Sequence, residues 1–299
     1  MSLPWYILCM GRSSLLAAAL IALATPALSE TTLERIERTS TLRAGTHSNA
    51  PPFAFKNKTG ELVGFSVDII SAIREALEKR MGKPIALDLQ EVDLDKRLPR
   101  IQSGDLDIAC DITTPTWERE EVVDFSVTIF FNGTRLLVDR GYSMGEIGSL
   151  RSPLVGVVSN SSTIKGVQEK ILAPKLVSFP NVRAAFEALE AGEVNAIAST
   201  DVILRNLQRR SSRPGRYSLI PINGYLSTEV IACTLPENDS RWRDFTNHTI
   251  ADLLHGVENY RGRYYEIYRK WFGSSQMTNL PLNKEAINHF KHIIDYYSQ

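Results

Sequence analysis

Short apolar runs alternate along the chain with segments in which hydrophobic residues recur at helical spacing. The best-defined helix starts near Ser66, carries its apolar residues on one face, and is ended by Gly82 and Pro84. Strands that alternate with helices in this order are typical of α/β units built around parallel strands. The first set of predicted elements comprises strands at 42–45, 85–89 and 106–110 and helices at 66–81 and 95–102.

After residue 125 the pattern changes to extended apolar segments around Gly133, which suits a chain that leaves one lobe for another. A second α/β set follows, and the apolar run 230–233 then predicts a second extended crossing, before the chain finishes in helices. The second set comprises strands at 154–158 and 196–198 and helices at 162–171, 182–191 and 202–208.

These two sets predict two α/β lobes joined by two extended crossings. We expect lobe 1 to comprise residues 30–133 and 230–299, and lobe 2 to comprise residues 134–229. In open α/β sheets, ligands bind beyond the carboxyl ends of the strands. The pattern therefore predicts a small-molecule site in a cleft between the lobes.

The N-terminus has the features of a secretory signal peptide. Arg12 precedes an apolar run at 15–24, and the helix breaker Pro26 and small residues up to Ser29 follow it. A membrane anchor is the alternative, but the run is shorter than the roughly 20 apolar residues that a span needs. We expect residues 1–29 to be cleaved and the mature protein to lie in the periplasm.

The composition of the chain mainly excludes certain partners. The chain is 43% hydrophobic and 23% charged, which is ordinary for a globular protein. Arg12 is the only charged residue among the first 29, so the remainder carries 33 basic and 34 acidic residues. This near neutrality offers no footprint for nucleic acid or for an anionic membrane surface, and we expect neither as a partner.

Two cysteines, Cys110 and Cys233, remain after the predicted cleavage, in a compartment that permits disulfides. A bridge between them would close a loop of roughly 120 residues and restrict the unfolded chain by roughly 4–5 kcal/mol. Two buried thiols that never meet are an equally acceptable interpretation. The sequence leaves both alternatives open.

Two local signatures of catalysis are missing from the sequence, which has no Gly-x-x-x-x-Gly-Lys and no His-Glu-x-x-His. His289 and His292 lie one helical turn apart, with Glu285 a turn before them, but no cysteine or second carboxylate completes a metal-binding set. An exposed face of the last helix explains the pair. We therefore expect no metal, no cofactor and no catalytic residue.

The segment CDITTPTWER at 110–119 is the richest in polar chemistry. Thr116 can cap a helix whose third residue is Arg119, so the arginine and the N–H groups of the first turn can converge on one anion. An arginine fork matches a carboxylate with two parallel hydrogen bonds. The alternative is a capped surface helix in which Arg119 pairs with Glu120 or Glu121.

Read with its neighbours, this segment resembles the family 3 periplasmic solute-binding proteins of ABC importers, over nearly the whole mature chain. Within that family, the closest likeness is to the glutamate/aspartate-binding branch. The family motifs are LRAGT at 42–46, PF at 52–53, GELVGFSVD at 60–68, QSGDLD at 102–107, ER at 118–119 and VDFS at 123–126. The branch motifs are KRLP at 96–99, TT at 113–114, TIF at 128–130 and GTRLL at 133–137.

The resemblance implies a fold of the periplasmic binding protein type II kind and ligand contacts on both lobes. Arg119 would hold the ligand α-carboxylate with help from Thr114, and Arg97 would approach a side-chain carboxylate. Ser162, at the start of a second-lobe helix, lies where the family places a hydroxyl that contacts the same α-carboxylate. The matched motifs add two further expected ligand contacts, Phe53 and Thr113.

Some positions depart from the family pattern. His47 stands where the acidic-ligand branch often has arginine, and Asp111 replaces a small residue beside the site. Family members commonly pair the ligand ammonium with a second-lobe acid at the position held here by Thr200. Asp201 or Asp111 would then take that role, or the role is left unfilled. We include both aspartates with His47 among the expected ligand contacts.

The resemblance implies the binding component of an ABC importer, which closes by hinge motion around an acidic or related amino acid and delivers it to an inner-membrane permease. We expect a monomer that performs no chemistry. One alternative is a cyclohexadienyl-type dehydratase on the same scaffold, for which Asp111 would be the cleft carboxylate. Another is a ligand-sensing protein that signals through a separate receptor.

Overall fold

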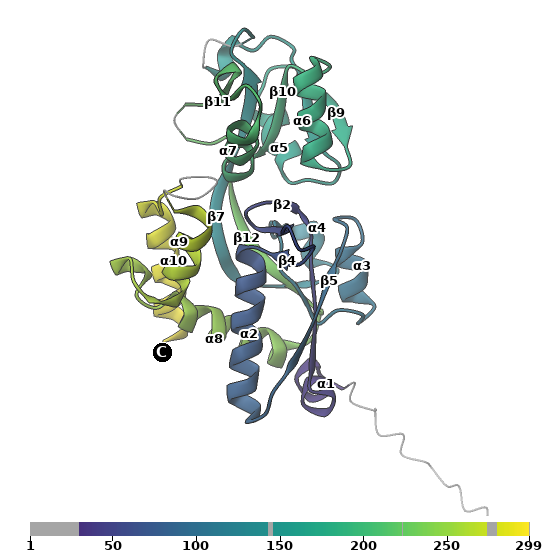
Figure 1. Cartoon of the computed structure of the whole chain (residues 1–299), viewed down its shortest axis with the longest axis vertical. Helices are drawn as coiled ribbons and strands as arrows, with labels where there is room; N and C mark the ends of the chain where they lie inside the picture. Colours follow the sequence, from purple (N-terminus) through teal and green to yellow (C-terminus); the bar gives the residue numbers. More distant parts are fainter. Residues whose placement is uncertain (1–29, 143–145, 223, 274–279, 299) are drawn as a thin grey trace, which may run out of the picture. The chain divides into compact units, whose positions relative to one another are not determined.

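The computed structural model describes residues 30–142, 146–222, 224–273 and 280–298 (Figure 1). The predicted signal peptide at 1–29 lies outside these residues. Within them, no helix combines the length and the hydrophobicity that a membrane crossing requires.

Two α/β lobes share one continuous sheet, whose strand order is β5-β1-β6-β12-β7-β10-β8-β9, with β11 paired to β7. Lobe 1 contributes three parallel strands, and lobe 2 contributes three others. The sheet strands are β1 (Thr41–Thr46), β5 (Ala86–Glu91), β6 (Ile108–Ala109), β7 (Asp124–Asp139), β8 (Leu154–Val158), β9 (Lys175–Phe179), β10 (Ala196–Thr200), β11 (Tyr217–Ile220) and β12 (Ser227–Leu235).

The two crossings predicted from the sequence are β7 and β12, and they pair with each other in antiparallel register from Asp124–Leu235 to Thr134–Ser227. Figure 1 shows these strands running side by side from lobe 1 into lobe 2. The α/β class, the two lobes and the two extended crossings are thus confirmed. The exact residue limits predicted for the lobes stay a prediction.

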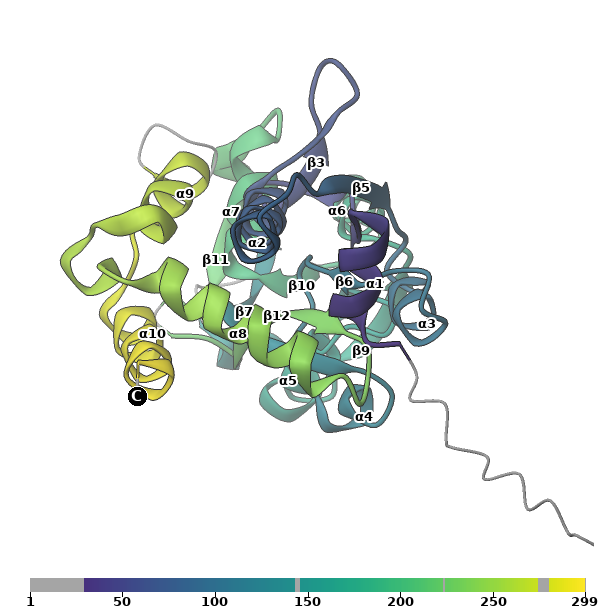
Figure 2. The ribbon, with the colours of Figure 1, turned by 90° about the horizontal axis from the view of Figure 1, so that it is seen from below.

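Helices cover the sheet in both lobes. In lobe 1, α8 packs on β7, as Figure 2 shows. Helices α2, α9 and α10 pack against α8. In lobe 2, α5 and α6 cover opposite faces, because alternate residues of β7 and β10 enter two separate cores. The lobe 1 helices are α1 (Thr32–Thr39), α2 (Phe65–Met81), α3 (Arg97–Gln102), α4 (Trp117–Glu120), α8 (Ser240–Leu254), α9 (Gly262–Phe272) and α10 (Lys284–Tyr297). Those of lobe 2 are α5 (Thr163–Lys170), α6 (Val182–Ala191) and α7 (Asp201–Arg210).

Most predicted elements agree with the structure to within a few residues, since apolar periodicity and caps set their limits. In α6, for example, the Asn181 side chain accepts a hydrogen bond from Ala184 N, and Gly192 ends the helix at a φ of 79°. Other elements were not predicted. They include α1, β9, β11 and the small separate sheet of β2 (Asn49–Ala50), β3 (Ala54–Lys56) and β4 (Leu62–Val63).

The lobe 1 core is rich in aromatic rings. Phe53, Phe65, Phe130 and Phe272 pack with ring centroids 4.7–6.0 Å apart, mostly edge to face or tilted. Tyr264 lies against the same group and satisfies its buried hydroxyl by donating to the Ile129 carbonyl at 2.8 Å. Phe130 belongs to β7, so this cluster anchors the crossing strand to the lobe 1 core.

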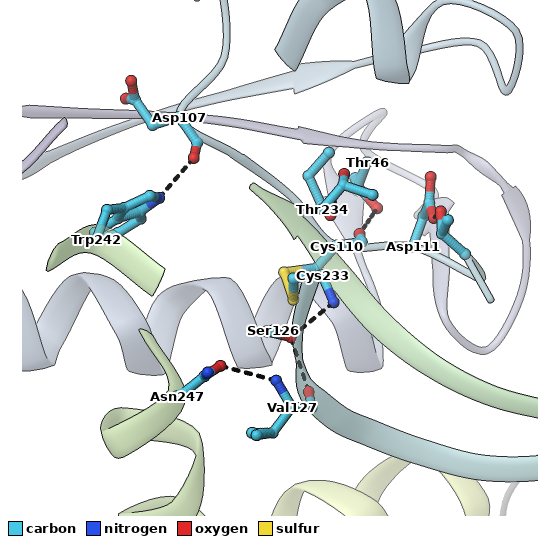
Figure 3. Close-up of a disulfide and its surroundings, with 12 residues drawn as sticks. Thr46, Asp107, Cys110, Asp111, Ser126, Val127, Cys233, Thr234, Trp242 and Asn247 are labelled. Atoms are coloured by element: carbon cyan, nitrogen blue, oxygen red, sulfur yellow. Dashed lines mark hydrogen bonds between the residues drawn. A yellow bond between two sulfur atoms is a disulfide. The ribbon is translucent and has the colours of Figure 1, made fainter. Parts of the chain in front are cut away.

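A disulfide joins Cys110 and Cys233 (Figure 3). The antiparallel pairing of Ala109 with Thr234 brings the two cysteines together, and both are fully buried. The Cys233 N–H donates to Ser126 Oγ at 2.9 Å, so the bridge lies where β6, β7 and β12 meet. Of the two alternatives that the sequence left open, the structure selects the disulfide.

Removing this disulfide will destabilise the folded protein. The bridge joins residues 123 apart, so its loss releases about 5 kcal/mol of loop-closure entropy to the unfolded chain in the entropy model. We expect a Cys110→Ala/Cys233→Ala variant to unfold at markedly lower denaturant concentration than the oxidised protein in equilibrium denaturation followed by circular dichroism. Equal unfolding free energies would contradict a stabilising bridge.

Candidate functional site

The predicted site lies at the carboxyl ends of β1 and β6, which are neighbouring parallel strands with Gly45 aligned to Ala109. His47 follows the end of β1, and Asp111 follows the end of β6 after Cys110. Because parallel strands end at the same edge of a sheet, both side chains face the region where lobe 1 meets the crossings.

Arg119 bridges the two lobes. It lies on α4, whose N-cap residue Thr116 accepts a hydrogen bond from the Arg119 N–H at 3.4 Å. Its guanidinium donates to the Thr114 carbonyl at 2.7 Å and, across the lobes, to the Asn160 carbonyl at 2.8 Å. Burial lowers the pKa of Arg119, and the nearby positive charge of Arg97 acts in the same direction. In the described residues, no ion pair joins Arg119 to Glu120 or Glu121.

Arg97 and Asp111 form a buried ion pair, with 3.6 Å between Arg97 Nε and Asp111 Oδ2. The guanidinium also donates to the Leu94 carbonyl at 2.7 Å, and the Thr113 hydroxyl donates to the other Asp111 oxygen. All three side chains are at least nine-tenths buried. The structure thus brings Arg97, Asp111 and Thr113 together, and the charge of Arg97 is balanced within the protein.

His47 lies beside this ion pair and is 7% exposed. Burial lowers the pKa of its imidazole, and this outweighs the opposite effect of the Asp111 charge. The ring is therefore neutral at pH 7, unlike the arginine that the acidic-ligand branch often has at this position.

Asp201 is held by two arginines. Its carboxylate lies 3.0 Å from Arg135 and 2.8 Å from Arg205, and only 2% of the residue is exposed. Arg135 is further fixed by the carbonyls of Leu219 and Ile222 at 3.1 and 3.2 Å. Asp201 thus ties α7 to the crossing strand β7.

Phe53 is placed apart from the other predicted contacts. Its side chain is fully buried in the aromatic core of lobe 1, where its ring lies 4.8 Å from that of Phe130. Its apolar surface is therefore used within the fold, and we draw no ligand contact from its position.

Glu229 on β12 is a site residue that sequence reasoning missed. It is 3% exposed, and its carboxylate accepts hydrogen bonds from hydroxyls of both lobes and of the crossing strands. The signal was present in the sequence as the one charged residue inside the extended run 227–235. The donors are Thr114 at 2.8 Å and Ser162 at 3.1 Å to Oε2, and Thr134 at 3.0 Å and Ser227 at 2.8 Å to Oε1.

The histidines at the end of the chain do not form a metal centre in the part of the chain that the structure describes. His289 Nε2 lies 2.9 Å from Thr128 Oγ1, and no group of three or more potential ligands is close enough to hold an ion within those ranges. The absence of a metal or cofactor from the function stays an expectation.

Two α/β lobes on a shared pair of crossing strands, with polar side chains of both lobes meeting beside that pair, define the class of two-lobed binding proteins. Residues 42–274 match the bacterial extracellular solute-binding proteins, family 3, and the chain belongs to this family.

Known relatives differ in the ligands that their names carry. The glutamate/aspartate import solute-binding protein of Salmonella typhimurium is 28% identical over 266 residues, covering 87% of this chain and 86% of the relative. The ABC transporter glutamine-binding protein GlnH of Bacillus subtilis is 27% identical over 242 residues, covering 80% and 84%. A solved ancestral arginine-binding protein bound to glutamine has a TM-score of 0.67 and 28% identity, covering 79% of this chain and 99% of that one.

The lowered pKa of His47 makes a prediction about pH. The imidazole of His47 takes up a proton less readily in the folded state than in the unfolded chain, where its pKa is near 6.5. The stability that neutral His47 gives the fold is therefore fully present above pH 6.5 and is lost as the pH falls below that value. An NMR titration of the imidazole, assigned by comparison with His47→Gln, should give a pKa below 6.5. A value at or above 6.5 would contradict the buried, neutral assignment.

Proposed function

We propose that this chain is the periplasmic solute-binding component of an ABC importer and that it binds an amino acid through the ligand's α-carboxylate. The observation that carries the proposal is the convergence of Arg119, Thr114 and Ser162 from both lobes. Thr114 and Ser162 donate to a single carboxylate oxygen, and Arg119 reaches from lobe 1 to a lobe 2 carbonyl. Hydroxyls and an arginine arranged in this way suit recognition of a carboxylate.

An acidic or related amino acid is the proposed ligand. Relatives named for glutamate and aspartate support this choice, as do Arg97 and the KRLP motif around it. Arg97 is balanced by Asp111 and His47 is neutral, so amides of the acidic amino acids belong in the same test panel. A relative named for glutamine binding favours the same panel.

In the proposed cycle, the ligand binds first to Arg119, Thr114 and Arg97 on lobe 1, and lobe 2 then closes by a hinge motion of β7 and β12. Closure brings Ser162 to the ligand carboxylate and Asp201 to the rim of the site. An inner-membrane permease recognises the closed protein, which acts as a monomer after removal of residues 1–29.

We propose that the protein performs no chemistry on the ligand. The dehydratase alternative needs a cleft carboxylate that is free to act on a substrate. Asp111 is instead engaged by Arg97 and Thr113, which does not favour that role. Incubation with prephenate or arogenate should therefore give no product.

Replacing Arg119 will abolish most of the affinity for the ligand. Truncating one member of a buried charge-assisted pair commonly costs 30-fold or more, so we expect Arg119→Ala to weaken binding by at least about 30-fold. Isothermal titration calorimetry with L-glutamate, L-aspartate, L-glutamine and L-asparagine measures this. Arg119→Lys should lose less, because it keeps the charge but not the fork.

Arg241→Ala is the matched control, since this lobe 1 arginine is exposed and its ion-pair partner among the described residues is the exposed Glu34, at 3.1 Å. It should bind as the wild type does. Equal affinity of wild type and Arg119→Ala would overturn the site assignment, and no binding of any panel member by wild type would overturn the proposed ligand class.

A further inference from the structure

Glu229 is a buried carboxylate with no cation partner in the part of the chain that the structure describes. It is 3% exposed, and none of the ion pairs in the described residues includes it. Acidic side chains are almost never fully buried unless they are paired, because removing an unpaired charge from water is costly. The four hydroxyls that surround Glu229 satisfy its oxygens but bring no positive charge.

Arg119, whose charge Glu229 also influences, has no ion-pair partner among the described residues. The Arg119 guanidinium donates to two neutral carbonyls, those of Thr114 and Asn160. Burial lowers the pKa of Arg119, while Glu229 is among the carboxylates whose charge opposes that effect, so the two charges act on each other without touching.

Thr114 sets the spacing between the two charges. Its carbonyl accepts from Arg119 Nη1, and its hydroxyl donates to Glu229 Oε2. A cation and an anion are thus held on two sides of one residue. An α-amino acid carries a carboxylate and an ammonium on the same carbon. Its carboxylate is complementary to the positive charge of Arg119, and its ammonium is complementary to the negative charge of Glu229.

The two other carboxylates considered for the ammonium are already engaged. Asp201 is paired with Arg135 and Arg205, and Asp111 is paired with Arg97 and accepts from the Thr113 hydroxyl. An ammonium would have to displace a cation from either one. Glu229 would lose only neutral hydroxyls.

We propose that Glu229 receives the ammonium of the amino-acid ligand and so makes the site specific for amino acids over plain carboxylic acids, an inference that rests on the proposed function. When the ligand binds, the hydroxyls of Thr114 and Ser162 stop donating to Glu229 Oε2 and donate instead to the ligand carboxylate beside Arg119. The ligand ammonium then donates to Glu229 Oε2. Thr134 and Ser227, which donate to Oε1, keep the Glu229 side chain in position.

The location of Glu229 adds a consequence for closure. It lies on the crossing strand β12, and its donors come from lobe 1, from lobe 2 and from β7. An ammonium bound there is held at the junction of both lobes. The charge of the ligand would therefore act directly on β12, one of the two strands of the proposed hinge.

The test compares amino acids with analogues that lack only the amino group. The probes are L-glutamate against glutarate and L-glutamine against glutaramate, titrated by calorimetry into the full mature chain. We expect wild type to prefer the amino acid of its preferred pair by at least about 30-fold, and Glu229→Gln to lose most of that preference. The variant should bind the analogue at least as well as wild type does, because a repulsive charge has been removed.

Controls separate this inference from the proposed function. If wild type binds no panel amino acid, the proposed function fails; if wild type shows the preference and a folded Glu229→Gln keeps it, only the ammonium role fails. Loss of the preference in Asp201→Asn or Asp111→Asn, with Glu229→Gln unaffected, would overturn the assignment in favour of that residue. Should Glu229→Gln not fold, as judged by circular dichroism, Glu229→Asp retains the charge on a shorter stem and should show a reduced preference; an unchanged one would overturn the role.

Discussion

The antiparallel pairing of β7 with β12 is the constraint on which the rest of the structure depends. Both α/β lobes are built outward from this pair, with β6 on one side and β10 on the other. The aromatic core fixes the lobe 1 end of β7, and the disulfide fixes β12 to the end of β6. Because the pairing sets which residues of the two strands meet, it also brings Thr134 and Ser227 to Glu229.

Charge is distributed in the site by a consistent physical rule. Buried ions need partners, and the buried charges of this protein find them in different ways. Asp201 and Asp111 are compensated by arginines, which leaves them as parts of the fold. Among the described residues, the hydrogen bonds of Glu229 and of the Arg119 guanidinium go to neutral groups, and neither side chain is in an ion pair. We infer that these two charges are suited to a ligand.

The fold identifies the family of this protein but does not identify its ligand. Relatives named for glutamate/aspartate and for glutamine share this architecture at similar identity, so the fold does not choose among such ligands. In this chain His47 is neutral, Arg97 is balanced by Asp111, and Glu229 is buried with no ion-pair partner among the described residues. We propose that such a site favours a zwitterion.

The sequence by itself determined the α/β class, the two crossings and the polar segment that ends at Arg119, because periodicity and helix caps are local and can be read residue by residue. Tertiary structure alone decided the pairing of Cys110 with Cys233 and the burial of Phe53 in the core. It also decided the burial of Glu229 among hydroxyls, one of which belongs to Thr114, 115 residues earlier. Such contacts depend on strand pairing between distant segments, and no local pattern records which distant hydroxyls will surround a single carboxylate.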